Sequence, residues 1–240
     1  MRTSPFNVIG APFRAASGTL TVGEIVFFAS HGDSLSKFMS ALVHLHVTTI
    51  TTADGADEID FFLQTAYDAK GAAFADTGQN LVVAVGGAAE GIIAGQRMSL
   101  SSGAIGAEPG DILRLGGERM FVVAMDSPSS NFVLVERGYA GDPVETHDAG
   151  VDIFRQAVTW EDVANVHFDN ADDGNTAEAF IAIGEMAAGV AVFTHSDLAL
   201  ADDTNRDLPL GDRLRLVTVL TAGVAPAYAY SAYVSLFGNV

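Results

Sequence analysis

Alternation of hydrophobic and polar side chains is the dominant pattern in this chain, and it predicts β-structure almost throughout. Within residues 38–50, Val43, Leu45 and Val47 share one face of the predicted strand, while polar side chains occupy the other face. Comparable segments, separated by turn residues such as Gly, Asn, Asp and Ser, predict strands at 19–28, 58–67, 111–115, 119–125, 131–136, 151–155, 159–168, 177–183, 190–194, 213–220 and 228–237. The Gly- and Ala-rich region 71–110 contains two apolar runs, at 81–85 and 92–100. No segment shows the 3.6-residue period of a long amphipathic helix.

The strands fall into two styles. Segments 16–75 and 157–240 contain long strands with aromatic residues, whereas segment 76–156 contains short strands separated by tight turns. Antiparallel strands in this number commonly form a two-sheet sandwich. We therefore predict an all-β fold: a jelly-roll-like antiparallel β-sandwich that is discontinuous in sequence. An inserted small β-barrel or sheet module would occupy 76–156, and residues 1–15 would form an N-terminal arm.

The charge of the chain restricts its partners. The 240 residues include 30 Asp and Glu but only 12 Lys and Arg, which gives a net charge of -18. Phosphate groups and anionic membrane surfaces repel such a protein, so we expect neither nucleic acid nor membrane as a partner. Mean hydropathy is nevertheless +0.28. Extensive burial explains both values, and part of that burial is expected between subunits of a homo-oligomer.

Cysteine is absent, which excludes disulfides, thiolate metal sites and cysteine nucleophiles. Residues 1–7 lack the apolar core of a signal peptide, so none is expected. The uncharged stretch from Leu216 onward is long enough to suggest a membrane anchor. Gly223, Pro226 and the alternating Tyr228 and Tyr230 instead favour a hairpin of two strands.

Histidines and acidic loops are the candidate metal ligands. His44 and His46 share a face of one strand, and a third ligand for the pair would come from His167 or Asp169. The alternative is a polar sheet face. Acidic loops at 169–175 and 202–207 lack the calcium-loop pattern and are expected to be solvated turns, with loose cation binding as the alternative. We therefore predict no metal site and no cofactor.

No catalytic constellation is recognisable. Ser196 beside His195 is a candidate nucleophile–base pair, and Glu161 with Asp162 is a candidate carboxylate pair. Adjacent strand residues point to opposite faces, so that pair does not flank one bond. The two glycine pairs, at 86–87 and 116–117, lack the Lys-Ser/Thr that follows a phosphate-binding loop. We expect a protein that is not an enzyme and has no catalytic residues.

Four aromatic residues are candidates for a sugar-stacking platform: Trp160, Tyr228, Tyr230 and Tyr233. Sandwich folds often carry carbohydrate sites, and Tyr228 and Tyr230 share a strand face. Packing in a core or an interface is the favoured reading of these side chains.

Three segments resemble a domain that recurs in structural proteins of tailed phages. Residues 62–68 (FLQTAYD) are similar to its "LQTSxD" strand end, and residues 159–168 (TWEDVANVHF) to the "TWxDVAxxxF" that normally follows closely. Here about ninety residues separate the two halves, which an insertion at a β-turn explains. Residues 210–215 (LGDRLR), with the aromatic final strand, resemble the close of that domain.

The insert resembles a second phage virion module, "GEQMLV…VxRGxxGT…HxAG". Residues 117–122 (GERMFV), 135–139 (VERGY) and 147–150 (HDAG) match it, but Asp142-Pro143 stands where Thr is usual. From the residues themselves we expect scaffold roles. Gly138 would supply a positive φ at a turn, Arg137 would pair with Glu118, and His147 would satisfy a backbone carbonyl.

Together the resemblances imply a virion structural protein, made in the host cytoplasm and located on the capsid surface. The favoured role is a head decoration (cement) protein that contacts the major capsid protein as a homo-oligomer, with a trimer favoured. Candidate contact segments are the C-terminal strands and the arm at 1–15. A tail, baseplate or fibre-attachment protein is the alternative within the virion, and a carbohydrate-binding module is the alternative of another class.

Overall fold

The computed structural model describes residues 9–15, 18–28, 35, 40–52, 54–66, 73–87, 93–101, 105–125, 131–184, 202–203, 206, 208, 210–211, 213–221 and 226–237. The regular elements of this part are β-strands and short 3-10 turns, and all strand pairs are antiparallel. The described chain divides into two compact units, which are 9–28, 40–66 and 160–237 on one side and 73–159 on the other. Each unit is described separately below.

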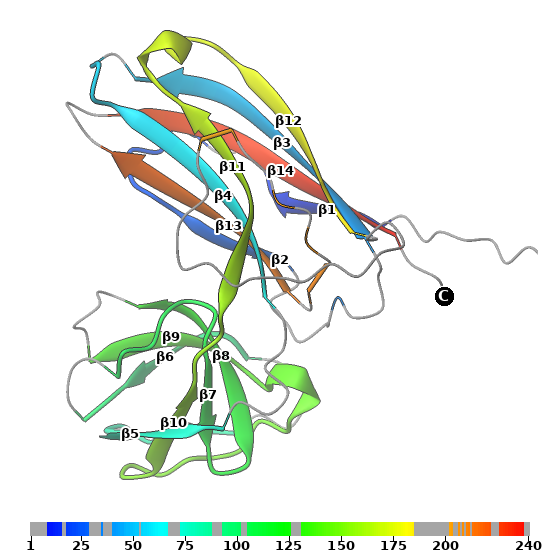
Figure 1. Ribbon diagram of the computed structural model, residues 1–240. Helices are drawn as coiled ribbons and strands as arrows, with labels where there is room; N and C mark the ends of the chain where they lie inside the picture. The colour runs from blue at the N-terminus through cyan, green and yellow to red at the C-terminus, as the bar shows by residue number, and fades with distance from the viewer. Residues whose placement is uncertain are drawn as a thin grey trace, which may run out of the picture. The chain divides into compact units, whose positions relative to one another are not determined.

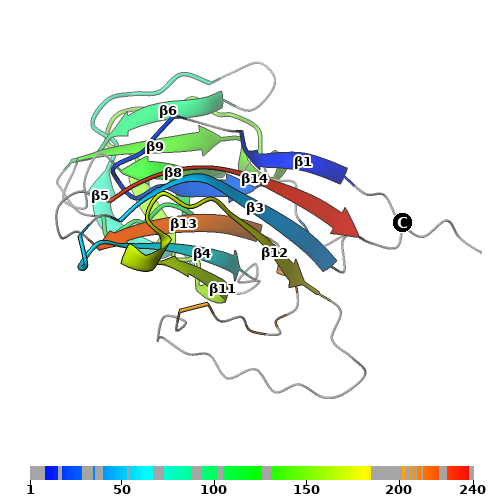
Figure 2. The same cartoon turned by 90° about the horizontal axis from the view of Figure 1, so that it is seen from above.

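The first unit is an eight-stranded arrangement of two sheets (Figure 1). One sheet contains, in order, β1 (Ile9–Arg14), β14 (Ala227–Phe237), β3 (Ser40–Thr51) and β12 (Ala177–Ile183). The other contains β11 (Trp160–Phe168), β4 (Glu58–Ala66), β13 (Arg213–Thr221) and β2 (Ile25–Phe28). Figure 2 shows β1, β14, β3 and β12 following one another in the order of the first sheet.

Aromatic contacts show that the two sheets pack face to face. Phe61 of β4 lies edge-on to Tyr228 and Tyr230 of β14, with ring centroids 5.5 and 5.1 Å apart. All three side chains are fully buried, with exposed fractions of 0%, 0% and 1%. The predicted antiparallel β-sandwich is therefore confirmed, with its core between β4 and β14.

The second unit is a six-stranded sheet that closes on itself. Its strands are, in order, β5 (Ala75–Asn80), β10 (Asp152–Gln156), β7 (Ile112–Leu115), β8 (Glu118–Met125), β9 (Phe132–Arg137) and β6 (Ile93–Ser99). Leu81 and Leu100, just beyond the outermost strands β5 and β6, form an antiparallel bridge. Val82 N donates to Ser99 O and Ser101 N to Asn80 O, both at 2.9 Å. The outermost strands thus pair at one end and make a small barrel.

The barrel core is aliphatic. Buried side chains from all six strands or the residues beside them form one cluster: Leu81, Val85, Met98, Leu100, Ile105, Ala107, Leu113, Leu115, Met120, Val122, Val133, Val135 and Ile153. Alternation along β9 places Val133 and Val135 in this cluster. The pattern that predicted the short strands therefore also indicates their buried faces.

One boundary prediction is wrong, and one strand was not predicted. Residues 9–14, expected within a free arm, form β1 and pair with β14. Gly10, Pro12 and a register shift between Pro12 and Arg14 make this strand hard to recognise, because both residue types are unusual in strands. β5 was not predicted because its sequence, ADTGQN, has low β-propensity. The predicted strand at 190–194 lies outside the described residues.

Segment 19–28 was predicted as one strand but is divided between the sheets. Leu20 forms a bridge with Tyr228 of β14, whereas β2 pairs with β13. The chain changes sheet near Gly23, where an added Cβ would lie only 2.5 Å from the backbone oxygen of Thr218. A residue with a side chain would clash there, so glycine permits the crossing.

The predicted C-terminal hairpin is also wrong. β13 and β14 lie in different sheets, where β13 pairs with β4 and β2 and β14 pairs with β3 and β1. Within the described part of the chain, no helix has the length and apolar character needed to cross a membrane.

Candidate functional site

The predicted ion pair of the barrel lies in its interior. The side chains of Glu118 on β8 and Arg137 on β9 are both 0% exposed. Arg137 Nε donates to Glu118 Oε1 at 3.1 Å, and Nη2 donates to Oε2 at 2.7 Å. The pairing expected from the sequence is confirmed, in a two-pronged geometry that matches the guanidinium to the carboxylate.

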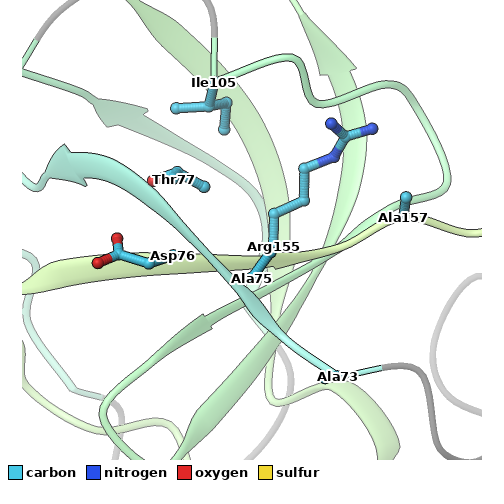
Figure 3. A pocket seen from close by; sticks show the side chains of 7 residues that line it. All are labelled: Ala73, Ala75, Asp76, Thr77, Ile105, Arg155 and Ala157. Atoms are coloured by element: carbon cyan, nitrogen blue, oxygen red, sulfur yellow. The ribbon is translucent and has the colours of Figure 1, made fainter.

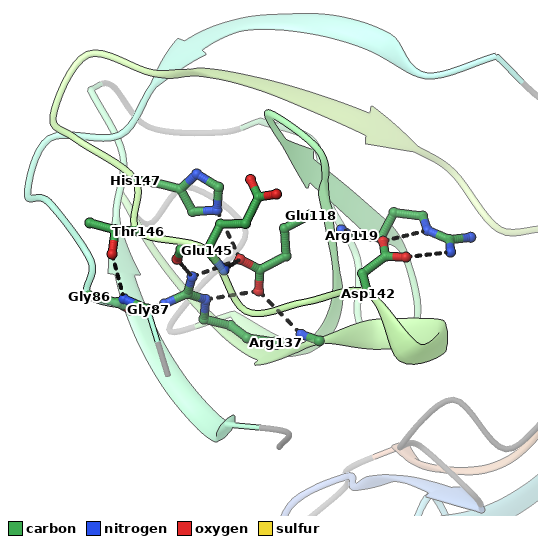
Figure 4. Close-up of polar contacts among 10 residues, drawn as sticks. Gly86, Gly87, Glu118, Arg119, Arg137, Asp142, Glu145, Thr146 and His147 are labelled. Carbon is green, nitrogen blue, oxygen red and sulfur yellow. Dashed lines mark hydrogen bonds and ion pairs between the residues drawn. The ribbon is translucent and has the colours of Figure 1, made fainter. Parts of the chain in front are cut away.

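Further groups satisfy this pair (Figure 4). Glu118 also accepts from the backbone N–H groups of Gly138 at 3.2 Å and Glu145 at 3.0 Å. Arg137 donates to the carbonyl of Gly86 at 2.5 Å and to that of Glu145. His147 Nε2 lies 2.9 Å from Glu118 Oε2. The expected role of His147 was wrong, since its ring meets this carboxylate rather than a backbone carbonyl.

The network keeps Glu118 ionised. Burial by itself would raise its pKa, but the hydrogen bonds from Arg137, Glu145 and His147 outweigh burial and lower the pKa of Glu118. Gly138 adopts the expected positive φ, 75°, at the turn that follows β9. In the segments that resemble the second phage module, Glu118, Arg137 and His147 thus hold the barrel together through their contacts with one another.

Asp142, where the chain departs from the usual pattern, has a defined partner. Its carboxylate accepts from the backbone N–H of Arg119 at 2.9 Å and from the Arg119 guanidinium, through Nε and Nη2, at 2.8 Å each. The Arg119 hydrogen bond is the main influence on the Asp142 carboxyl, and it lowers the pKa of that group. Asp142 therefore links the turn after β9 to Arg119 at the start of β8.

The first resemblance also has a structural basis. β4 and β11 are hydrogen-bonded neighbours, with Ala66 opposite Trp160, so its two halves meet in space. Gln64 Nε2 donates to Asp162 Oδ1 at 2.6 Å. Thr65 Oγ1 accepts from Gly211 N at 2.9 Å. An added Cβ on Gly211 would lie 2.3 Å from the backbone oxygen of Ala66, so the LGDR segment needs glycine there.

The candidate metal ligands around His44 and His46 do not come together. Both lie on the outward face of β3, next to buried Val43 and Leu45. His167 lies on β11 of the opposite sheet, also facing outward. Asp169 follows β11, and its Oδ1 accepts from the backbone N–H of Ala171 at 2.7 Å. The combination of His44 and His46 with either residue is therefore wrong.

His167 instead meets two carboxylates. It is opposite Asp60 of β4 in the strand register, and its Nδ1 lies 2.9 Å from Asp60 Oδ1. Asp202 Oδ1 lies 3.8 Å from the same nitrogen. Among the described residues, Asp60, His167 and Asp202 form a group of three potential metal ligands, whose ligand atoms all lie within 4.8 Å of one another. Asp60, His167 and Asp202 are called the carboxylate–histidine cluster below.

Neighbouring groups shape this cluster. Asn165 Nδ2 donates to Asp60 Oδ1 at 3.0 Å. The carboxylate of Asp203 accepts from the backbone N–H of His167 at 3.0 Å, which places the loop bearing Asp202 beside β11. Burial of the His167 ring opposes its charge, but the hydrogen bond and charge of Asp60, followed by the charges of Asp202 and Glu58, raise the pKa of His167.

Sequence reasoning named His167 and the 202–207 loop but did not connect them. Asp60 was missed altogether. Its outward position in the alternating pattern of β4 was a usable signal, because β4 and β11 were already recognised as parts of one motif. The strand register that places Asp60 opposite His167, and the position of Asp202 beside them, come only from the tertiary structure.

The acidic loop at 169–175 is a hydrogen-bonded turn. A 3-10 turn spans Asn170–Asp172, and Asp172 Oδ2 accepts from Asp169 N at 3.2 Å. Asp173 Oδ1 accepts from the backbone N–H of Thr52 at 3.0 Å. These carboxylates thus stabilise the loop and its attachment to β3, as a turn would require.

The sugar-stacking platform expected as an alternative is not assembled. Tyr228 and Tyr230 belong to the sandwich core, and their hydroxyls donate to Val22 O at 2.8 Å and Glu24 Oε2 at 3.2 Å. Trp160 carries the guanidinium of Arg215 over its ring, 4.3 Å from the centroid. Core packing of Tyr228 and Tyr230 was the favoured reading, and it is confirmed.

An aromatic row lies on the outer face of the sandwich. Tyr233 of β14 is opposite His44 of β3, which is opposite Phe180 of β12. The rings of His44 and Phe180 stack at 4.3 Å with planes inclined by 7°. Phe180 is 62% exposed and Tyr233 is 45% exposed. These three side chains are called the outer aromatic row below.

The described residues among the catalytic candidates lie in a strand and in turns. Glu161 and Asp162 are consecutive on β11, and Asp162 accepts the hydrogen bond from Gln64. Gly87 N donates to Thr146 Oγ1 at 3.0 Å, and Gly116 adopts a φ of 56° in the turn between β7 and β8. The glycine pairs are thus turn elements. Ser196 and His195 lie outside the described residues.

A pocket of about 310 Å³ opens on the barrel unit (Figure 3). It is lined by Ala73, Ala75, Asp76, Thr77, Ile105, Arg155 and Ala157. Its polar side chains are engaged within the barrel: Asp76 Oδ1 accepts from Gly78 N at 2.8 Å, and Thr77 Oγ1 donates to Ile153 O at 2.6 Å. Arg155 Nε donates to Asp111 Oδ2 at 2.7 Å. The polar side chains that line the pocket therefore already have hydrogen-bond partners within the barrel.

Comparison with known proteins yields no match to a protein-family model, to a curated protein or to a solved structure.

Proposed function

We propose that this chain is a structural protein of a tailed-phage virion, and specifically a head decoration protein that binds neighbouring major capsid subunits as a homo-oligomer. The sequence resemblances support this role. The structural observation that carries it is the outer aromatic row, a hydrophobic feature on a solvent-facing sheet. The action would be mechanical, because binding energy from covered surface would hold capsid subunits together.

The order of strands supports a jelly-roll winding of the sandwich. Successive strands β1, β2, β3 and β4 alternate between the two sheets, and so do β11, β12, β13 and β14. β4 and β11 are neighbours in one sheet. Eight strands that cross between two sheets in this way are the arrangement of a double-sheet jelly roll, an architecture used by viral capsid domains.

The outer aromatic row has the properties of a contact surface. Its rings come from three adjacent strands, so the sheet backbone holds them in a fixed relation. Aromatic side chains are enriched where proteins associate, because they bury much area with few rotatable bonds. The row includes Tyr233 of β14, one of the C-terminal strands expected to make contacts. We assign the major capsid protein as its occupant.

A rigid scaffold would suit this role. The barrel is cross-linked internally by the Glu118–Arg137 network, and the sandwich is filled by interlocking aromatic rings. Closed oligomers such as trimers would place several copies of the row around one axis. Several weak contacts then act together as a tight one.

The test is capsid occupancy of a Phe180→Ser, Tyr233→Ser double variant, measured by cosedimentation with capsids of the same phage. We expect occupancy to fall by about tenfold or more, as for loss of central interface aromatics. A Val83→Ser, Val219→Ser variant removes apolar side chains that are 60% and 42% exposed elsewhere, and serves as the control. Equal occupancy of both variants and the wild type would contradict the assigned surface.

Location in the particle tests the role itself. A reconstruction of the virion should show many copies on the head, whereas a few copies at the tail would support a tail, baseplate or fibre-attachment protein. Absence of the chain from purified particles would contradict a virion function. Binding of oligosaccharides on a glycan array that is lost in the Phe180→Ser, Tyr233→Ser variant would instead assign the row to carbohydrate recognition.

A further inference from the structure

We propose that the carboxylate–histidine cluster of Asp60, His167 and Asp202 binds a divalent transition-metal ion, with Zn²⁺ as the best-fitting candidate. The three side chains come from three segments of the sandwich unit, which are β4, β11 and the loop that carries Asp202. They provide one imidazole nitrogen and two carboxylate oxygens. The proposal is independent of the virion role, because it concerns a site within one chain.

The distances fit one ion with small adjustments. Ligand atoms about 2.1 Å from a tetrahedral zinc ion lie about 3.4 Å from one another. The two separations measured from His167 Nδ1, 2.9 Å to Asp60 Oδ1 and 3.8 Å to Asp202 Oδ1, lie on either side of that value. The Asp202 side chain is 68% exposed and can rotate, so the longer separation is easily shortened.

The ligand types select the metal class. Imidazole nitrogen is a common ligand of Zn²⁺ and other transition metals, whereas Ca²⁺ and Mg²⁺ prefer oxygen ligands alone. Two carboxylates and a neutral imidazole also compensate both charges of the ion. Three protein ligands leave a fourth tetrahedral position for water.

The surroundings hold two of the ligands in place. Asp60 and His167 face each other across paired strands, and each side chain is only 14% exposed. The amide of Asn165 donates to Asp60 Oδ1, the kind of outer contact that orients a metal-binding carboxylate. The backbone hydrogen bond from His167 to Asp203 anchors the loop next to Asp202. The site therefore combines two positioned ligands with one adjustable ligand.

The charge of the protein favours cation capture. At a net charge of -18, divalent cations are concentrated near the surface. Glu58 lies close enough to influence the charge of His167, which adds a third carboxylate to the local field. This field attracts all cations, so selectivity for a transition metal must come from the imidazole.

The experiment is calorimetric titration of the full chain with Zn²⁺, with Mg²⁺ and Ca²⁺ for comparison. We expect one high-affinity zinc site per chain, and weaker binding of the other two ions. Asp202→Asn and His167→Asn should each weaken the zinc site by about tenfold or more, because each removes a direct ligand. Asp202→Asn is the main variant, since its exposed position makes a folding defect improbable.

Glu178→Gln is the matched control. Glu178 lies beside another outward-facing histidine, with its Oε1 3.9 Å from His44 Nε2, and the substitution removes the same charge from the sandwich. Zinc binding should be unchanged in this variant. The proposal is overturned if the wild type binds no zinc, if Asp202→Asn and His167→Asn bind zinc normally, or if Glu178→Gln weakens binding equally. Equal affinity for Zn²⁺ and Mg²⁺ would overturn the assignment to a transition metal.

Discussion

The protein contains two clusters in which a histidine nitrogen lies 2.9 Å from a carboxylate oxygen, and they differ in burial and in net charge. In the barrel, Glu118 and Arg137 are fully buried. The Glu118 carboxylate accepts hydrogen bonds from the Arg137 guanidinium and from two backbone N–H groups, and the ring of His147 also contacts it. In the sandwich, His167 lies between Asp60 and the exposed Asp202, with negative charge in excess.

The difference shows that burial and compensating charge, rather than residue types, distinguish a structural cluster from a candidate binding site. A buried carboxylate is tolerated only when its charge and lone pairs are compensated, and the Arg137 guanidinium provides that compensation. An open cluster with surplus carboxylates can accept a cation, because a cation reduces the repulsion among them. The following changes test this contrast, from the largest expected effect to the smallest.

Removing the charge of Arg137 should have the largest effect on stability. Arg137→Met retains much of the volume but leaves Glu118 buried without its cation, which should lower the free energy of unfolding of the barrel by about 3–5 kcal/mol. Trp160, the only tryptophan, lies in the sandwich, whereas far-ultraviolet circular dichroism detects both units. In urea titrations, the circular dichroism change should begin before the change in Trp160 fluorescence.

Arg119→Met is the control for that substitution within the same barrel. Arg119 pairs with Asp142, but its side chain is 40% exposed. Water screens the pair, so the loss should be about 0.2–1 kcal/mol. Similar losses for Arg119→Met and Arg137→Met would contradict the special role assigned to the buried pair.

His147→Leu should have an intermediate effect. The substitution removes a polar ring next to Glu118 and leaves a buried carboxylate oxygen with fewer donors, at a cost of about 1–3 kcal/mol. Urea unfolding followed by circular dichroism measures it. An unchanged free energy of unfolding would show that the remaining donors satisfy Glu118 without the histidine.

The stability of the barrel should depend on acid through Glu118. Its pKa is lowered in the folded state from the usual 4.5, so its contribution is fully present above that value and is lost as pH falls through the folded pKa. Each unit of lowering corresponds to about 1.4 kcal/mol. The measurement is the difference in unfolding free energy between wild type and Glu118→Gln, from neutral pH to pH below 4.5. A difference that does not shrink with acid would contradict an ionised Glu118.

Asp202→Asn should have the smallest effect on stability. The side chain is 68% exposed, and its removal relieves repulsion with Asp60, so the free energy of unfolding should change by no more than about 0.5 kcal/mol. Trp160 fluorescence during thermal unfolding, in metal-free buffer, measures the change. A loss of several kcal/mol would show that the open cluster is structural after all.

Much of this protein was predictable from the sequence, because alternation is a local signal. Strands β3, β4 and β11 begin and end close to their predicted limits, and along most of β3 and β4 the buried side chains recur at every second position. The Glu118–Arg137 pair was also expected from the residues themselves, as an ion pair across the small β module. The antiparallel β-sandwich was likewise predictable, because the alternation that indicates its strands is a local property of the sequence.

Only the tertiary structure decided which strands are neighbours and which side chains meet. Residues 9–14 form a strand because they pair with the edge of β14, and β13 and β14 lie in different sheets although they follow one another in sequence. Asp60, His167 and Asp202 converge through strand register and loop position, which depend on pairings between distant segments. A sequence determines the faces of its strands locally, but the partners of those faces result from the packing of the whole unit.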